Sequence, residues 1–364
     1  MKNITADDLL RLRMRNLGIS NATFGEAQPA VFAKTVTHLG AVQAQDFPGA
    51  KWSLGLRAPG TTDCDVEAAI AEKAIVRTWA LRGTLHLLPA KDVRWILALI
   101  APRVTPNYAG ACRRLALTED LIARSQAVLA NCLAGGRCLT RPEVFEALEA
   151  AGIPLGENRG SYILYRAALD RVICQANRRG KEFTFTVLDE WTPGGVALDG
   201  DDALAELTRR YFSSHGPATE RDFAWWSGLT FSAVRAGIAM IRSELVEVVS
   251  EGQSHWMSAS GGTDCCPSSE AYLLPGFDEF MLGYRDRGGA IPERFRESLK
   301  PANGVFTPII VIDGRVVGTW RRTANARAIK VEITPFAPLS GAQTEAIAVA
   351  AERFCAFHGK PWEE

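Results

Sequence analysis

Two glutamine side chains, Gln43 and Gln45, stand two positions apart on either side of the small residue Ala44. On a continuing helix, residues i and i+2 project about 200° apart and do not share a face. If the helix ends near Val42 and the chain extends ahead of Pro48, both amides project to one side. Two convergent amides can each donate and accept hydrogen bonds, so together they can hold a water molecule or the edge of a nucleobase. The alternative is that both are solvent-exposed glutamines at a helix end, without a function.

Composition favours a soluble protein without a metal or cofactor. The chain has 364 residues, is 47% hydrophobic, and balances 41 basic residues against 41 acidic ones, so any nucleic-acid surface must come from local segregation of charge. No apolar run approaches the roughly 20 residues of a membrane span. The eight cysteines contain no CxxC pair, which is typical of reduced thiols in a cytosolic protein. We therefore expect two or three domains, a cytoplasmic location and no membrane contact.

Three consecutive stretches repeat one arrangement, in which helices lead into a two-stranded hairpin. The first predicts helices over 7–17, 29–42, 47–56 and 65–72, and a hairpin of 75–80 and 84–88 around Leu81-Arg82-Gly83. The second predicts helices over 121–133, 140–151 and 160–174, and a hairpin of 172–175 and 182–187. The third predicts helices over 203–212, 219–226 and 231–243, and a hairpin of 245–249 and 255–257. Helices followed by a hairpin are typical of the winged helix, and a threefold repeat predicts three such domains.

The last third of the chain adds strands and a closing helix. Asp313-Gly314, between 308–312 and 315–320, is a strong hairpin signal, and 328–334 predicts a further strand. Residues 343–357 predict an amphipathic helix. The predicted fold is α+β and helix-rich, with three tandem winged helix-turn-helix domains, a C-terminal β-hairpin or meander and a closing helix. We place the domains at 1–117 (winged helix 1, with the two glutamines), 118–198 (winged helix 2) and 199–364 (winged helix 3, with the β-rich extension).

Four motifs spread along the chain carry a family resemblance. They are Val42–Gln45, Arg82–Leu88, Leu273–Arg287 and Gly318–Arg322. Together, and in this order, they resemble the AlkZ-like winged-helix DNA glycosylases over nearly the whole chain. The resemblance implies three tandem winged helices in a C-shape around DNA. It also implies the excision of bulky or crosslinking alkyl adducts at guanine N7.

The resemblance assigns a role to the two glutamines. The family's catalytic signature is glutamine, aliphatic residue, glutamine, and it maps onto Gln43 and Gln45 with Ala44 between them. Other members carry aspartate in place of the second glutamine, so Gln45 indicates the branch that unhooks crosslinks. An N7-alkylguanine is cationic and already a good leaving group, so hydrolysis needs a positioned water more than strong acid catalysis. We assign Gln45 to orient the water and Gln43 to assist it or the sugar.

Other residues that could contribute chemistry are weaker candidates. His86 lies in the hairpin that follows the glutamines and can face the same cleft, although a lone histidine on an apolar strand is more often a hydrogen-bonded core residue. Asp278 and Glu279 are adjacent, so on a strand they point to opposite faces and make a poor acid–base pair. We expect Asp278, Arg285, Asp286 and Arg287 to form structural ion pairs at a domain junction. Trp225 and Trp226 are expected to pack within their own domain rather than to stack on bases.

Two basic clusters are candidate DNA contacts. The first consists of Arg178, Arg179 and Lys181, in the predicted tip 176–181 of the second hairpin. The second consists of Arg321, Arg322, Arg327 and Lys330. Basic hairpin tips that contain glycine suit contacts to phosphates or to a groove, and the alternative for each cluster is a solvated surface.

We interpret the chain as a monofunctional DNA repair glycosylase that acts as a monomer on double-stranded DNA with alkylated guanine, in the cytoplasm at the nucleoid. No His, Cys, Asp and Glu residues show the spacing of metal ligands, so we expect neither metal nor cofactor. The alternative is a non-catalytic winged-helix transcriptional regulator that uses the same wings to read sequence. Such regulators usually have dimer symmetry, and the sequence contains no heptad-like dimerisation element. Glutamines buried outside any cleft would favour the regulator or a structural role.

Overall fold

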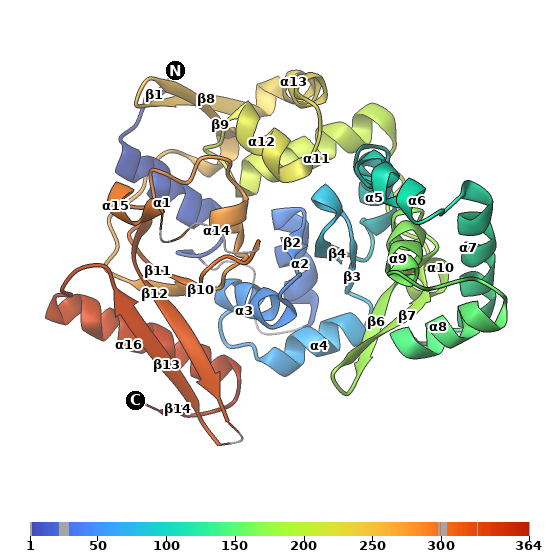
Figure 1. Cartoon of the computed structure of the whole chain (residues 1–364). Helices are drawn as coiled ribbons and strands as arrows, with labels where there is room; N and C mark the ends of the chain where they lie inside the picture. Colours follow the sequence, from blue (N-terminus) through green and yellow to red (C-terminus); the bar gives the residue numbers. More distant parts are fainter. Residues whose placement is uncertain (1, 22–28, 298, 300–303, 326, 364) are drawn as a thin grey trace.

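The computed structural model describes residues 2–21, 29–297, 299, 304–325 and 327–363. The fold is a mixed α+β arrangement in which helices surround three separate β-sheets (Figure 1). Residues 29–89 lie in the middle of the molecule, with 93–191 on one side and the C-terminal strands on the other (Figure 1). The predicted helix-rich α+β class is therefore confirmed.

The first third of the chain contains the elements that carry the glutamines. They are β1 (Lys2–Asn3), α1 (Ala6–Asn16), α2 (Pro29–Leu39), β2 (Val42–Gln43), α3 (Phe47–Arg57), α4 (Asp63–Ala71), β3 (Ile75–Trp79), η1 (Leu81–Gly83), β4 (Leu85–Pro89), α5 (Val93–Val104), η2 (Thr105–Tyr108) and α6 (Ala109–Arg114). Thr5 and Thr62 open α1 and α4 as capping boxes, and Pro48 lies in the first turn of α3. The predicted hairpin is present as β3 and β4.

The middle third forms a second group of helices with a hairpin. It consists of α7 (Glu119–Leu133), β5 (Leu139–Thr140), α8 (Arg141–Ala150), α9 (Arg159–Leu169), β6 (Ile173–Arg179), β7 (Glu182–Val187) and α10 (Leu188–Trp191). The capping box of Thr140 and Glu143 opens α8 as predicted. The predicted tip 176–181 is wrong in extent, because a β-bulge lets β6 continue pairing as far as Arg179. Only Gly180 and Lys181 remain between the strands.

The last third joins a third helical group to the β-rich extension. It consists of α11 (Gly200–Ser214), α12 (Glu220–Ser227), α13 (Phe231–Met240), η3 (Arg242–Glu244), β8 (Leu245–Ser250), β9 (Gln253–Ser258), η4 (Ala259–Gly261), β10 (Ala271–Leu274), α14 (Glu279–Leu282), α15 (Glu293–Arg296), β11 (Ile309–Ile312), β12 (Arg315–Ala324), β13 (Ile329–Pro335), α16 (Gly341–Phe357) and β14 (Trp362–Glu363). Asp313 and Gly314 both take positive φ between β11 and β12, as the hairpin signal predicted. The meander and the closing helix are confirmed.

The first two hairpins are parts of one sheet rather than two separate wings. Its six strands run in the order β2-β4-β3-β6-β7-β5, and β3 meets β6 through the pair Arg77 and Gln175. The third hairpin, β8 and β9, pairs instead with β1, and β10 to β14 form the remaining sheet. Each of the three groups does place helices before a hairpin. Its assignment as a winged helix, and the boundaries after residues 117 and 198, stay interpretations.

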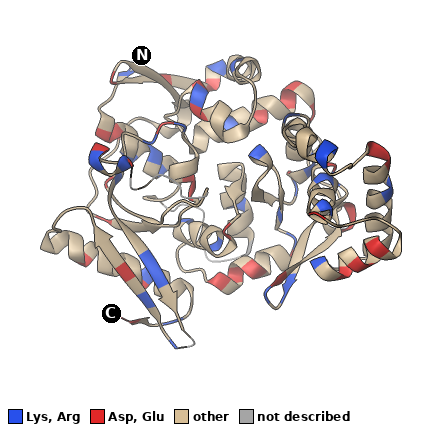
Figure 2. Cartoon of the chain, viewed as in Figure 1, with Lys and Arg blue, Asp and Glu red and all other residues tan. Residues whose placement is uncertain are grey.

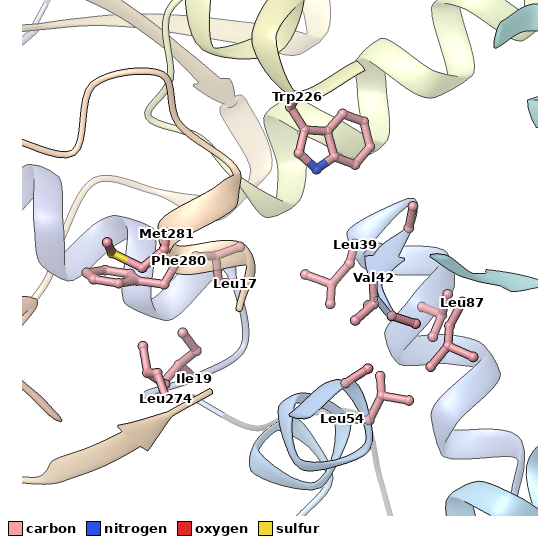
Figure 3. Close-up of a cluster of buried hydrophobic side chains, with 14 of the residues drawn as sticks. Leu17, Ile19, Leu39, Val42, Leu54, Leu87, Trp226, Leu274, Phe280 and Met281 are labelled. Atoms are coloured by element: carbon pink, nitrogen blue, oxygen red, sulfur yellow. The ribbon is translucent and has the colours of Figure 1, made fainter. Parts of the chain in front are cut away.

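The hydrophobic core divides differently from the sequence. Most of the buried side chains between Leu115 and Phe185 form a core of their own, in the middle third. Side chains of the first and last thirds share a larger core, which Tyr165, Leu169 and Cys174 of the middle third also join. Figure 3 shows its centre, where Trp226 of α12 points toward Leu39 and Val42 from the end of α2 and the start of β2. The segment that carries the glutamines is thus fixed by residues nearly 200 positions away in the chain.

Candidate active site

The two glutamines lie where the chain leaves α2 and enters the six-stranded sheet. After α2, Gly40 takes a left-handed φ of 81° that turns the chain into β2. Gln43 then pairs with His86 of β4, and the pairing continues one residue further. The segment is therefore extended through Ala44, and Gln45 lies at the bend that follows. Both glutamine side chains contact the β3–β4 hairpin, Gln43 through Arg82 and Gln45 through the Leu85 backbone N–H.

Gln43 is held by its backbone and by its side chain. Only 6% of the residue is exposed. Its Oε1 accepts a hydrogen bond from Arg82 Nη2 at 2.8 Å, and its backbone N–H donates to Glu279 Oε1 at 3.2 Å. Its Nε2 makes no hydrogen bond with a described residue. Gln43 is thus a fixed amide with one unused donor group.

Gln45, by contrast, is exposed and loosely held. Its Oε1 accepts from the Leu85 backbone N–H at 3.4 Å, which is long for an N–H···O bond. Within the described chain its Nε2 has no partner either. A ligand or a water can therefore replace the contact of Gln45 at little cost.

Arg82 occupies the tip of the β3–β4 hairpin, within η1. Its φ of 56° lies in the left-handed region, which is uncommon for a residue with a side chain. Gly83 follows with a φ of 79°, and a Cβ atom there would lie 2.6 Å from the Tyr165 hydroxyl and 2.7 Å from the Tyr108 hydroxyl. The two tyrosines therefore pack directly against the tip. On the other side Arg82 reaches α12, where its Nη1 donates to the carbonyl of Trp226.

Glu279, at the start of α14, is the second charged group of this site and is 1% exposed. Besides Gln43, its carboxylate accepts from Trp226 Nε1 at 2.8 Å and from His215 Nε2 at 3.3 Å. Burial raises the pKa of this carboxyl, but the bond from His215 and the charge of Arg82 outweigh burial, so the net pKa lies below its ordinary value. Glu279 is therefore ionised at neutral pH.

The sequence did not reveal the importance of Arg82 and Glu279. Both residues lie in motifs that carry the family resemblance, but the sequence assigns neither of them a role. It places Arg82 in a turn, and it treats Asp278 and Glu279 as neighbours on a strand. In the structure Asp278 is instead the N-cap of α14, and it forms a buried ion pair with Arg57 at 2.8 Å, as predicted for a structural carboxylate. The capping preference of aspartate was the available signal that Glu279 begins a helix.

His86 faces Gln43 across the β2–β4 pair but is only 1% exposed. Its Nδ1 lies 2.9 Å from the Thr84 carbonyl, which makes Nδ1 the donor and leaves Nε2 buried without a partner in the described part of the chain. Burial and the charge of Arg82 lower the pKa of His86 to about 3, so the ring is neutral. This environment favours the alternative of a hydrogen-bonded core residue, which supports the strand of Gln43. The catalytic role of His86 stays an untested hypothesis.

The two adjacent tryptophans have different environments. Trp226 is fully buried, between the guanidinium of Arg82 and the carboxylate of Glu279. It packs against the first third of the chain as well as its own helix (Figure 3). Trp225 is 44% exposed, and Arg287 lies 5.7 Å from the centre of its ring. The expectation that both pack within their own domain is therefore correct for neither in full.

The basic residues predicted to contact DNA differ in whether an acidic side chain already pairs with them. Arg178 forms an ion pair with Glu67, and Arg179 forms one with Glu143 at 2.6 Å, whereas Lys181 is exposed in the turn. The arginines of the second cluster are all exposed, and no acidic group among the described residues pairs with them. They are Arg321, Arg322 and Arg327. Figure 2 shows basic residues along β12 and β13 and at the β6–β7 tip, with acidic residues interspersed along the neighbouring helices.

Other chemical sites are not evident around the glutamines. The described residues contain no group of three or more His, Cys, Asp and Glu side chains that could hold a metal ion. None of their helices combines the length and apolar character needed to cross a membrane. A cavity of about 1000 Å³ lies between α5 and α9 and is lined by Leu97, Arg113 and Arg166 among others, but by neither glutamine. The candidate site is therefore identified by its polar contacts and not by this cavity.

The fold and this site define a mixed α+β protein with two glutamines at its centre, one of which is held by the half-buried Arg82 and the buried Glu279. A family model described as DNA glycosylase AlkZ-like matches residues 36–357, and the chain belongs to this family. The interstrand DNA cross-link repair glycosylase of Streptomyces sahachiroi is 28% identical over 346 residues, which cover 89% of this chain and 91% of that protein. The solved structure of Streptomyces sahachiroi DNA glycosylase AlkZ superposes with a TM-score of 0.83 at 25% identity, and the match covers 100% of both chains.

Proposed function

We propose that this chain hydrolyses the N-glycosidic bond of bulky or crosslinked N7-alkylguanine in double-stranded DNA, with a water positioned by Gln43 and Gln45. The observation that carries the proposal is the pair of amides at the end of β2, one firmly held by Arg82 and one exposed and loosely held, in a member of the AlkZ-like DNA glycosylase family. The relative from Streptomyces sahachiroi is named for interstrand cross-link repair, which supports the same class of lesion.

The chemistry suits uncharged amides. Alkylation at N7 makes the guanine cationic, so the base leaves readily and the sugar develops oxocarbenium character. The enzyme then has to orient a water against the sugar and stabilise the developing charge. Paired carboxylates of the kind used by glycoside hydrolases are not required, because the leaving group needs little protonation.

The different environments of the glutamines suggest different roles. Gln45 is exposed and has only one weak hydrogen bond, so it can turn its amide to accept a hydrogen bond from the attacking water and to donate one to the sugar. Gln43 is fixed and assists with its unused Nε2 group. His86 supports β2 from the neighbouring strand as a neutral ring.

Contacts to the DNA backbone would come from exposed basic residues away from the glutamines. The best supported are Arg321, Arg322 and Arg327, together with Lys181, because their charges are free of acidic partners among the described residues. Arg178 and Arg179 would have to leave Glu67 and Glu143 first. We further propose that three winged-helix units present these residues, and that the protein acts as a monomer at the nucleoid in the cytoplasm.

A glycosylase assay tests the proposal. The wild-type protein, in excess over a duplex with one N7-methylguanine, should produce an abasic site that becomes a strand break only after alkali, because a monofunctional enzyme does not cut the backbone. An undamaged duplex of the same sequence is the control. Tight binding without abasic sites, together with a preference for one undamaged sequence, would instead identify a transcriptional regulator.

A further inference from the structure

Arg82 and Glu279 hold the same two residues through opposite kinds of hydrogen bond. Glu279 accepts from the Gln43 backbone N–H and from the Trp226 indole N–H. Arg82 donates to the Gln43 amide oxygen and to the Trp226 carbonyl. Gln43 and Trp226 thus each give one donor to the carboxylate and one acceptor to the guanidinium. These bonds close a ring that joins β2, η1, α12 and α14.

We infer that Arg82 is a positioning residue that fixes the orientation of the Gln43 amide, so that Gln43 offers only its N–H groups to a bound ligand. A guanidinium has five donors and no acceptor, so the amide group that faces it must be the oxygen. The Nε2 group of Gln43 is left without a partner among the described residues. The inference rests on the proposed function, because the ligand in question is the attacking water or the lesion.

The tip of the hairpin is built to keep Arg82 in this position. The left-handed backbone of Arg82 persists only where its surroundings hold it, and the hydroxyls of Tyr108 and Tyr165 pack against the next residue, Gly83. The guanidinium itself is held at both ends, by the Gln43 amide oxygen and by the Trp226 carbonyl.

A fixed amide and a free amide divide the work between the glutamines. Turning the Gln43 amide around would place its NH2 group against a guanidinium and lose a charge-assisted bond. Gln43 can thus donate to an acceptor, such as the water oxygen or an oxygen of the lesion. Accepting a hydrogen bond from the water remains for Gln45. A carboxylate at position 43 would still bind Arg82 but would have no proton to donate, whereas a carboxylate at position 45 would still accept.

A double-mutant cycle on single-turnover excision tests the link. Gln43→Ala should reduce the rate by roughly 10²-fold, as expected when one positioned donor is lost. Arg82→Met should reduce it by about 10-fold, because the amide is still present but no longer held. If Arg82 acts through Gln43, the double variant should be no slower than Gln43→Ala alone. A product of the two effects, about 10³-fold, would overturn the inference.

Controls separate positioning from general stability. Arg94 also makes several hydrogen bonds, to Asp189, Thr192 and Gly194. None of these bonds involves Gln43, Gln45 or Arg82. Arg94→Met should excise at the wild-type rate. If Arg82→Met does not fold, Arg82→Lys takes its place in the cycle, because lysine keeps the charge but cannot bridge both acceptors. Affinity for lesion duplex should change less than about twofold in Arg82→Lys, since phosphate contacts made elsewhere carry most of it.

A measurement without DNA makes the result independent of activity. The Nε2 resonance of Gln43, identified by its loss in Gln43→Ala, should shift when Arg82 is replaced by lysine, and it should stay in place in Arg94→Met. An unchanged resonance in the Arg82 variant would overturn the inference even if the enzyme is active. Failure of the wild type to excise any base would refute the proposed function instead, and would leave the resonance test of the amide orientation standing.

Discussion

The β3–β4 and β6–β7 hairpins belong to one sheet but end in tips with opposite surroundings. At the first tip a Cβ on Gly83 would meet two tyrosine hydroxyls within 2.7 Å. At the second tip Gly180 also takes a positive φ, 64°, yet nothing lies within 4 Å of a Cβ there. The same local motif therefore serves once as an internal support and once as a surface element. Its neighbours, and not its own sequence, decide which.

The arginines of the two hairpins differ in the same way. Arg82 binds neutral oxygens, of Gln43 and Trp226, so its charge orients parts of the site. Arg178 and Arg179 bind the carboxylates of Glu67 and Glu143, so much of their charge is neutralised. The hairpin that looks most basic in sequence consequently offers less free positive charge than its composition suggests. Its turn offers one unpaired cation, Lys181, among the described residues.

The largest effect should come from the free amide beside the buried tip. Gln45→Ala should reduce single-turnover excision by roughly 10²-fold, because the amide acts mainly in the transition state. Affinity for lesion DNA should barely change. Gln45→Glu should retain more activity than the alanine variant if accepting from water is the main task, and no more if donation matters. Wild-type rates in both Gln43→Ala and Gln45→Ala would refute the catalytic assignment.

A matched pair of glycine substitutions tests the hairpin comparison itself. Gly83→Ala should slow excision by about 10-fold and destabilise the fold, because a positive φ costs a side chain about 1–2 kcal/mol and the new methyl group meets both tyrosine hydroxyls. Gly180→Ala carries the same backbone cost without a contact, so excision should be unchanged. Single-turnover rates and denaturant unfolding measure both effects. Equal loss of excision in the two variants would contradict the distinction.

A smaller effect is expected at the exposed tip. The slope of the logarithm of the binding constant against the logarithm of the salt concentration reflects the number of phosphate contacts. Loss of three free cations would make this slope shallower by about 0.9 for each, or about 2.7 in total. Because Arg178 and Arg179 are paired with glutamates, we expect a decrease closer to about 0.9 for the triple alanine variant, and nearly the same for Lys181→Ala alone. Binding of damaged and undamaged duplex is measured at several salt concentrations. A decrease near 2.7 would mean that both ion pairs open on DNA.

The elements of the fold were largely predictable, because their signals are local. Capping residues such as Thr140, the Asp313-Gly314 turn and the glycine-containing β3–β4 turn each mark an element boundary by its own chemistry. The joining of two hairpins into one sheet was not predictable in this way. It depends on the pairing of Arg77 with Gln175, almost 100 residues apart, and no local pattern encodes that contact.

The site was predictable only in its central residues. The spacing of Gln43 and Gln45 and the family motif identified the amides. Their opposite environments follow from partners in three other segments, above all Arg82 and Glu279, whose roles depend on the tertiary packing. The exposure of Lys181 against the pairing of Arg178 is a further difference that depends on a distant residue, Glu67.

The smallest effect on excision should come from replacing His86, which lies on β4 just after the β3–β4 turn. Its burial instead makes the stability of the fold depend on pH. Burial lowers its pKa to about 3 in the folded chain, against an ordinary value of about 6.5. The unfolded chain therefore binds a proton that the folded chain does not, so this contribution to stability is complete above pH 6.5 and is lost as pH falls from 6.5 toward 3. Between pH 6.5 and pH 5 the loss should reach about 2 kcal/mol.

Replacing His86 by glutamine should remove that part of the pH dependence. Other histidines with lowered pKa values, such as His215 and His255, titrate in both proteins, so the difference between wild type and variant isolates the buried ring. Denaturant unfolding at pH 7.5 and pH 5 measures it. Since the neutral ring only supports β2, the excision rate per folded molecule should remain within about twofold of wild type at pH 7.5. Parallel stability curves for the two proteins would show that His86 is open to solvent, and would return it to the candidates for direct contact with DNA.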